Sequence, residues 1–312
     1  MRKLVIQLVL LLGVAGLLGG LTLRWALQRP YLDPFYTRFT TPPAGSLVLG
    51  TSRAAQAVQP AVLRARLGQR YEGPWLNYAF TAMHSPYGPS YLASIRRKLA
   101  PTAQHGLFVV AVDPWALSLL KPRQPDKAPV FPEDELMIGQ LNLVNQNPNF
   151  EYLAHYLTAP LYHAFFTDTL HAVERLHRDG WLEIDLPSPT ADSGRYRERL
   201  AEKLVTYRQL ARTSYLAPAR LQSLQQLIAL LRSHGQVVLV RLPTGAGLAA
   251  IEQGYQPQFD QLMQQTGAAF GVPYLNYIAA RYPTTDGNHL WYAATYSFSQ
   301  RLANDIARLA GQ

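Results

Sequence analysis

Two short polar segments, about 230 residues apart in this chain of 312 residues, carry the side chains that nucleophilic catalysis requires. Residues 50–53 read Gly-Thr-Ser-Arg and follow an apolar run, whereas residues 286–289 read Asp-Gly-Asn-His and precede the last helical segment. A serine hydroxyl is a weak nucleophile at neutral pH, so it needs a base within hydrogen-bond reach and a group that fixes the tautomer of that base. The two segments together contain all three groups.

The order of these residues predicts their roles. Ser52 is the candidate nucleophile, and His289 is the candidate base that takes its proton and returns it to the leaving group. Asp286 is expected to accept a hydrogen bond from the other imidazole nitrogen. Taken alone, a serine in a strand-to-helix loop usually caps the helix, and an aspartate before a helix is a common cap as well. The combination of the three favours catalysis over capping.

The order Ser, Asp, then His three residues later resembles the SGNH (GDSL-like) hydrolase and esterase superfamily. It is similar in particular to membrane-anchored relatives that modify cell-surface polymers in bacteria, such as the lipoteichoic-acid D-alanylation protein. The resemblance covers the chain from about Ser46 to Ala310. It implies a membrane-anchored domain outside the cytoplasm, periplasmic or at the cell surface, that acts on small acyl groups of cell-envelope glycans.

The same resemblance implies three donors for the oxyanion of an acyl-transfer reaction. They are the backbone amide of Ser52, a glycine amide after the second strand, for which Gly88 is the candidate, and an asparagine side chain after the third strand. The chain departs from the family at the third donor, because Asp113 occupies that place and a carboxylate repels an oxyanion. Asn77 and Arg53 are the candidate substitutes. Alternatively, Asp113 caps its own loop.

Strand-like and helix-like segments alternate along most of the chain. Buried strands are expected at residues 46–49, 75–80, 107–112, 236–240 and 272–276, and helices at 60–67, 89–99, 221–233, 259–270 and 292–309. Strands separated by helices form parallel sheets that helices cover on both faces. We therefore expect an α/β fold with a flavodoxin-like doubly wound parallel sheet, three-layer and SGNH-like, in which the loops after the strands lie at one edge.

The chain divides into an anchor, a linker and one large domain. Residues 1–24 are expected to form a transmembrane helix, 25–45 a proline-rich linker, and 46–312 the α/β domain. A partly helical insertion at about 115–220 interrupts the alternation with prolines, asparagines and aromatic residues. This insertion either shapes a substrate pocket or extends the core or a subunit contact, and the sequence favours neither reading.

Composition limits the class of protein. With 48% hydrophobic and 16% charged residues the chain can bury a large core, and the absence of cysteine excludes disulfides and thiolate chemistry. Residues 4–23 are apolar except for Gln7 and Thr22, and this stretch is long enough to span a bilayer as a helix. An uncleaved anchor is favoured over a signal peptide, because no small-residue cleavage site precedes Arg24.

The formal charge of +9 does not predict nucleic-acid binding, because the basic residues are spread thinly and no recognition motif is present. No metal-ligand or dinucleotide-binding spacing occurs, and the predicted chemistry requires no cofactor. The expected partners are an acylated glycan or other cell-envelope polymer, the membrane and envelope proteins. Two alternatives to an esterase or acyltransferase remain open at this stage. One is a catalytically silent scaffold that binds a surface polymer or a partner protein, and the other is a periplasmic ligand-binding module.

Overall fold

A computed structural model describes residues 1–29, 32–122, 129–157, 165 and 173–309. A five-stranded parallel sheet forms its centre, with the strand order β2-β1-β3-β8-β9. Counted within this sheet alone, the order is 2-1-3-4-5, which is that of flavodoxin-type doubly wound sheets. The expected α/β class and parallel sheet are therefore confirmed.

The strands of this sheet run at β1 (Ser46–Leu49), β2 (Trp75–Asn77), β3 (Gly106–Ala111), β8 (Gly235–Arg241) and β9 (Tyr274–Asn276). Two small antiparallel pairs accompany it, β4 (Ser118–Leu120) with β7 (Ser214–Leu216), and β5 (Glu174–Leu176) with β6 (Leu182–Ile184). The helices are α1 (Arg2–Leu27), α2 (Tyr36–Thr40), α3 (Ser52–Ala57), α4 (Pro60–Leu67), α5 (Pro89–Lys98), α6 (Met137–Gln140), α7 (Phe150–His155), α9 (Ser193–Thr213), α10 (Pro218–Arg232), α11 (Ala246–Tyr255), α12 (Phe259–Phe270) and α13 (Tyr292–Leu309). Short 3-10 helices lie at η1 (Trp115–Leu117) and η2 (Pro132–Glu135).

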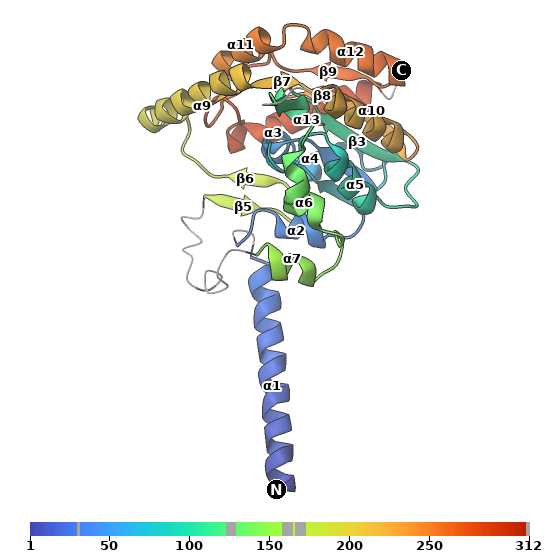
Figure 1. The fold of residues 1–312 in the computed structure, drawn as a ribbon, viewed down its shortest axis with the longest axis vertical. Coiled ribbons are helices and arrows are strands. Elements are labelled where there is room, and N and C mark those ends of the chain that lie inside the picture. Colours follow the sequence, from blue (N-terminus) through green and yellow to red (C-terminus); the bar gives the residue numbers. More distant parts are fainter. Residues whose placement is uncertain (30–31, 123–128, 158–164, 166–172, 310–312) are drawn as a thin grey trace.

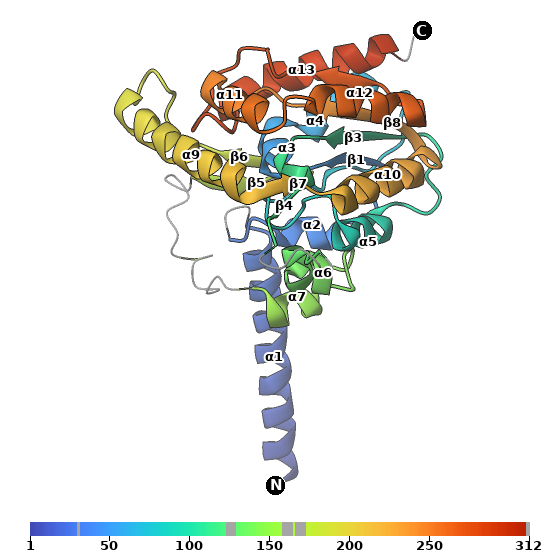
Figure 2. The same ribbon diagram turned by 45° about the horizontal axis from the view of Figure 1, so that its top comes forward.

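Side chains that alternate along the strands fill two separate hydrophobic layers. From β3, Phe108 and Val110 pack with α5, α10 and α12 on one face of the sheet. From the same strand, Leu107 and Val109 pack with α3, α4 and α13 on the other face. Strands that are buried on both faces read as continuous apolar runs, which explains why β3 is easily located in the sequence. The result is three layers, with helices above and below the sheet (Figure 2).

The N-terminal helix α1 projects away from the domain (Figure 1). It is one helix of 26 residues, its most apolar window has a mean hydropathy of 2.5, and that window is not buried against the protein. By length and composition α1 can cross a membrane. Its last residues, Ala26 and Leu27, are buried in the hydrophobic core, so the anchor is packed against the domain it carries.

The segment expected to be a linker is part of the core. Within residues 25–45, α1 continues to Leu27 and α2 buries Tyr36, Arg38 and Phe39. Phe39 contacts the rings of Tyr78, Phe80 and Tyr152. Aromatic residues therefore pack this segment against the domain, because their rings bury a large apolar surface there.

The insertion at 115–220 contains η1, β4, η2, α6, α7, β5, β6, α9 and β7, and it leads into α10. Residues 123–128, 158–164 and 166–172 of it lie outside the described part of the chain. The hairpin β5–β6 and α9 lie over the end of the sheet where the candidate catalytic residues are found (Figure 1). Leu141, Val144 and Tyr152 of the insertion also extend the hydrophobic core.

Lys98 on α5 is fully buried and gives the fold a pH dependence. Its Nζ donates to the Thr41 carbonyl oxygen at 2.7 Å, and burial lowers the pKa of Lys98 to about 7. The unfolded chain binds a proton on Lys98 up to its ordinary pKa of about 10.4, whereas the folded chain loses that proton near pH 7. The free energy of unfolding therefore rises with pH between about 7 and 10.4, by up to about 1.4 kcal/mol per pH unit from this group.

We expect Lys98→Met to flatten this slope, because methionine keeps the apolar stem and removes the titrating group. Thermal unfolding at about pH 7 and pH 9 measures the slope. The control is Lys121→Met, since Lys121 is exposed and should leave the slope of the wild-type protein unchanged. A Lys98→Met protein that gains stability with pH as steeply as the wild type contradicts the assignment.

Candidate active site

Ser52 lies at the point where β1 turns into α3. Gly50 makes this turn with φ 139°, a conformation that side chains disfavour, and Ser52 is the first residue of the helix. The amides in the first turn of a helix have no acceptor within the helix. The backbone N–H of Ser52 and its partly exposed hydroxyl are thus both placed at the carboxyl end of β1.

Gly50→Ala is expected to disturb this turn. A Cβ at residue 50 would lie 2.9 Å from the Ala111 Cβ, and the positive φ would strain any other residue. We expect a loss of about 1 to 3 kcal/mol in the free energy of unfolding and a displaced Ser52. Chemical denaturation measures the stability. Gly254→Ala is the matched control, because a Cβ there meets nothing within 4 Å and alanine favours the helix α11.

The structure brings Ser52, His289 and Asp286 together. The Ser52 Oγ lies 2.9 Å from the His289 Nε2, and the His289 Nδ1 lies 2.9 Å from the Asp286 Oδ2. These distances are those of hydrogen bonds, and they have the connectivity of a Ser-His-Asp triad. His289 and Asp286 belong to the loop before α13 and are 9% and 7% exposed, so the pair is largely withdrawn from water.

Asp286 is held in its ionised form. Burial by itself raises the pKa of a carboxyl group, but His289 and two backbone N–H donors, those of Asn288 and His289 at 2.9 Å each, lower it more. The pKa of Asp286 consequently lies well below its ordinary value. Lys203 of α9 adds a charge at 3.6 Å from the Asp286 Oδ2. An ionised Asp286 requires the proton on His289 Nδ1, which leaves Nε2 free to accept from Ser52.

Asn288 is a site residue that the sequence interpretation did not single out. Arg53 Nε donates to the Asn288 Oδ1 at 2.8 Å, which turns the Asn288 Nδ2 toward His289. This Nδ2 lies 3.1 Å from the His289 Nε2. Because Nδ2 can only donate, the contact supports the same imidazole tautomer as Asp286 does, and Asn288 shares the single Nε2 lone pair with the Ser52 hydroxyl. The adjacent positions of Asn288 and His289 in the sequence do not predict this contact between their side chains.

Arg53 is buried in a network of charges behind the triad. Its Nη2 pairs with the Glu252 Oε1 at 2.5 Å, and the Glu252 Oε2 pairs with the Arg241 Nη2 at 3.0 Å. Burial alone lowers the pKa of an arginine, but Glu252 overcomes this and raises the pKa of Arg53 above its ordinary value. Arg53 was a candidate to contact substrate directly. Its charge is instead used internally to hold Asn288.

The Ser52 hydroxyl opens into a cavity of about 250 Å³. The cavity is lined by Pro34, Phe35 and Arg38 from the segment after the anchor, Ser52, Ala55 and Gln56 from α3, Phe80 and Thr81 after β2, and Glu174, Leu182 and Ile184 from the hairpin β5–β6. The segment at 25–45, which was expected to be a linker, and the insertion at 115–220 therefore both contribute to the wall of the cavity beside Ser52.

Two of the predicted oxyanion donors are placed elsewhere. The Asn77 Nδ2 donates to the Ala54 and Val58 carbonyl oxygens at 2.8 and 2.9 Å, so its amide is used to hold α3. Gly88 packs against the ion pair of Glu133 and Arg220, where a Cβ would meet the Glu133 carboxylate. Among the described residues that line the Ser52 cavity, Phe80 and Thr81 represent this loop. The assignments of Asn77 and Gly88 as donors are therefore not supported by the geometry.

Asp113 caps its own loop, as the alternative interpretation held. Its Oδ1 accepts the backbone N–H groups of Trp115 and Ala116 at 2.9 Å each, which begins the 3-10 helix η1. Burial raises the pKa of Asp113, although the charge of Arg53 opposes this. The carboxylate is thus occupied by backbone amides, and it serves the structure of the loop rather than an oxyanion.

No family model and no curated protein matches this chain. In the described part of the chain, no group of three His, Asp or Glu side chains is arranged to hold a metal ion.

Proposed function

We propose that this chain is a membrane-anchored serine esterase or acyltransferase of the SGNH type. Ser52 attacks an acyl carbonyl, His289 takes the serine proton and returns it to the leaving group, and Asp286 holds the imidazole. The acyl group passes from Ser52 to water or to a hydroxyl of a cell-envelope glycan. The observation that carries the proposal is the pair of 2.9 Å contacts that join Ser52, His289 and Asp286 across the fold.

Three further observations support this function. The triad lies at the carboxyl end of β1, where α/β proteins bind ligands. The cavity at Ser52 has the size for a small acyl group such as acetyl or D-alanyl. The apolar α1 would hold the domain near a membrane, which places a cell-envelope polymer within reach if the domain faces outward. The Ser52 amide is the proposed oxyanion donor.

Labelling with a fluorophosphonate probe tests the proposal, because such probes phosphonylate only an activated serine. The full chain in lipid nanodiscs should label at one site, and Ser52→Ala should remove the label. Ser233→Ala is a suitable control, since Ser233 is exposed at the end of α10 and its Oγ donates to the Leu230 carbonyl oxygen at 2.7 Å. Labelling that persists in Ser52→Ala contradicts the assignment of Ser52 as the nucleophile.

A catalytically silent scaffold is the second candidate, and one specific observation favours it. The side chains of Asn77, Arg53 and Asp113 are all occupied by internal partners. The site therefore has fewer evident oxyanion donors than acyl transfer usually employs. In this function the chain binds a surface polymer or a partner protein without turnover. A wild-type protein that fails to label and does not hydrolyse simple esters favours the scaffold.

A further inference from the structure

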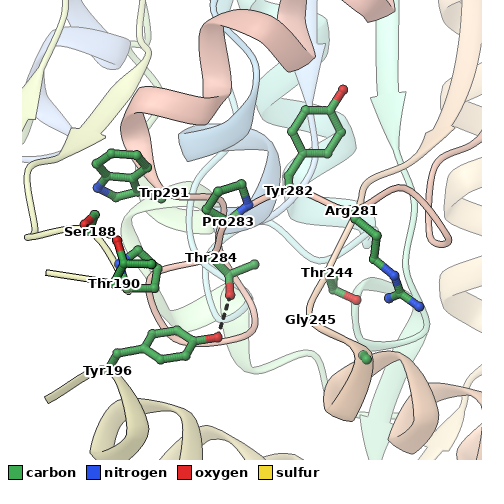
Figure 3. Close-up of a pocket in the computed structure, with 12 residues that line it drawn as sticks. Ser188, Thr190, Tyr196, Thr244, Gly245, Arg281, Tyr282, Pro283, Thr284 and Trp291 are labelled. Carbon is green, nitrogen blue, oxygen red and sulfur yellow. Dashed lines mark hydrogen bonds between the residues drawn. The ribbon is translucent and has the colours of Figure 1, made fainter. Parts of the chain in front are cut away.

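A second pocket, of about 350 Å³, is lined in part by the segment that carries Asp286 and His289, and shares no lining residue with the Ser52 cavity. Figure 3 shows the side chains that line it. They come from the segment before α9, from α9 itself, from the loop after β8 and from the loop before α13, and they include Tyr196, Thr244, Arg281, Thr284 and Trp291. The pocket is thus built at the carboxyl ends of β8 and β9, where parallel sheets bind ligands.

The pocket wall is joined to the catalytic loop by hydrogen bonds. The Gly287 N–H donates to the Thr284 Oγ1 at 3.1 Å, and the Gly245 N–H donates to the Gly287 carbonyl oxygen at 2.8 Å. Tyr196 contacts the same Thr284 hydroxyl at 3.2 Å (Figure 3). A ligand held against Thr284 therefore touches the loop that positions Asp286.

The polar groups of the pocket include two that lack a protein partner. Thr244 is 4% exposed, and its Oγ1 is buried without a hydrogen bond. A buried hydroxyl without a partner costs free energy, so a ligand group that reaches it gains a hydrogen bond that the chain does not supply. Arg281 is exposed at the pocket, and within the described residues it has no hydrogen bond or ion pair. Among the described residues that line the pocket none is acidic, so Arg281 gives it a positive charge.

The aromatic side chains present ring surface rather than polar atoms. Trp291 uses its Nε1 to donate to the Leu186 carbonyl oxygen at 2.9 Å, and Tyr196 uses its hydroxyl on Thr284. Their rings stand on the side of the pocket opposite Thr244 and Arg281 in Figure 3. Aromatic rings pack on the apolar C–H face of a sugar, while hydroxyl and guanidinium groups bind its oxygen atoms.

We propose that this second pocket binds an anionic saccharide. Its carboxylate or phosphate pairs with Arg281, a hydroxyl of the sugar satisfies the Thr244 Oγ1, and the ring packs against Trp291 and Tyr196. As a binding site the pocket is independent of the serine chemistry. Its role as the subsite for the acceptor of the acyl group rests on the proposed function.

Saturation-transfer NMR on the full chain in nanodiscs tests the binding. A Ser52→Ala background removes any turnover, so the failure of this proposal is distinguishable from the failure of the proposed function. The probes are D-glucuronate and D-glucose 6-phosphate, which separate a carboxylate from a phosphate ligand, and uncharged D-glucose as their control. We expect one or both anionic sugars to bind about tenfold more tightly than D-glucose, which is the size of one charge-assisted hydrogen bond.

Two substitutions locate the binding. Arg281→Gln should remove the preference for the anionic sugars, with about a tenfold loss of affinity. Thr244→Val should weaken binding while the thermal stability remains equal or rises, because valine replaces a hydroxyl that has no partner in the protein. Arg66→Gln is the matched control, since Arg66 lines a different pocket and should leave binding unchanged. The proposal is overturned if neither anionic sugar binds, if D-glucose binds as tightly, or if Arg281→Gln has no effect.

Discussion

The full chain with His289→Ala is expected to lose the hydrolysis of p-nitrophenyl acetate by about 10⁴-fold in kcat/KM. Without the imidazole, Ser52 loses the one side chain among the described residues that accepts its hydrogen bond, and the Asn288 Nδ2 next to the imidazole can only donate. Ser52→Ala should fall to a similar rate, and the double variant should be no worse, since the two residues act as one unit. Steady-state kinetics in nanodiscs, corrected for the uncatalysed reaction, measure the effect.

Asp286→Asn refines this prediction. Asparagine keeps the shape of the side chain but can no longer hold the proton on His289 Nδ1, so we expect a loss of about 10² to 10⁴ with Ser52 still present. His105→Ala is the control, because His105 is exposed and remote in sequence from both catalytic segments. If His289→Ala hydrolyses the ester as fast as the wild type, the triad has no catalytic role. If the wild type itself is inactive, the silent scaffold is favoured.

Glu252→Ala is expected to lower the free energy of unfolding by about 3 to 5 kcal/mol. Glu252 is fully buried, and its carboxylate accepts from Arg53, Arg241 and the Trp115 Nε1. Its removal leaves two buried guanidinium groups with one partner fewer each, and an unpaired buried charge costs far more than a lost surface contact. Urea unfolding followed by circular dichroism measures the change.

Glu252→Ala should also weaken the site, because Arg53 loses the partner that holds it against Asn288. We therefore expect slower fluorophosphonate labelling at Ser52 than in the wild type. Glu252→Gln, which keeps the hydrogen-bond acceptor without the charge, should lie between the two proteins in stability. Arg175→Gln is the control, since Arg175 is about half exposed and its ion pair with Glu183 is worth at most about 1 kcal/mol. If Glu252→Ala lowers the free energy of unfolding by less than about 1 kcal/mol, the buried network around Glu252 does not stabilise the fold as proposed.

The main elements of the sheet could be predicted because each depends on a local pattern. The run at 46–49 and the helices at 60–67, 259–270 and 292–309 have the bounds expected of them. Elements with a weak pattern are harder to predict. The six-residue α3 is too short to show a helical period. In α9 an apolar stripe runs through Tyr196, Leu200, Leu204, Tyr207 and Ala211 at helical spacing, but within the described structure Tyr207 is the only buried residue of this helix, and the surrounding insertion is rich in prolines and polar residues.

Local patterns in the sequence predict the alternation of strands and helices, the apolar N-terminal helix, and the residue types Ser, Asp and His in an order that permits a triad. Which polar side chains are free for chemistry depends on contacts between distant parts of the chain. Arg53 meets Asn288 and Glu252 at sequence separations of 235 and 199 residues, and Asn77 is used to hold α3. Such pairings follow from the burial of both partners in three dimensions, since a buried polar group must find a partner wherever the fold provides one. A local pattern in the sequence cannot predict which distant residue becomes that partner.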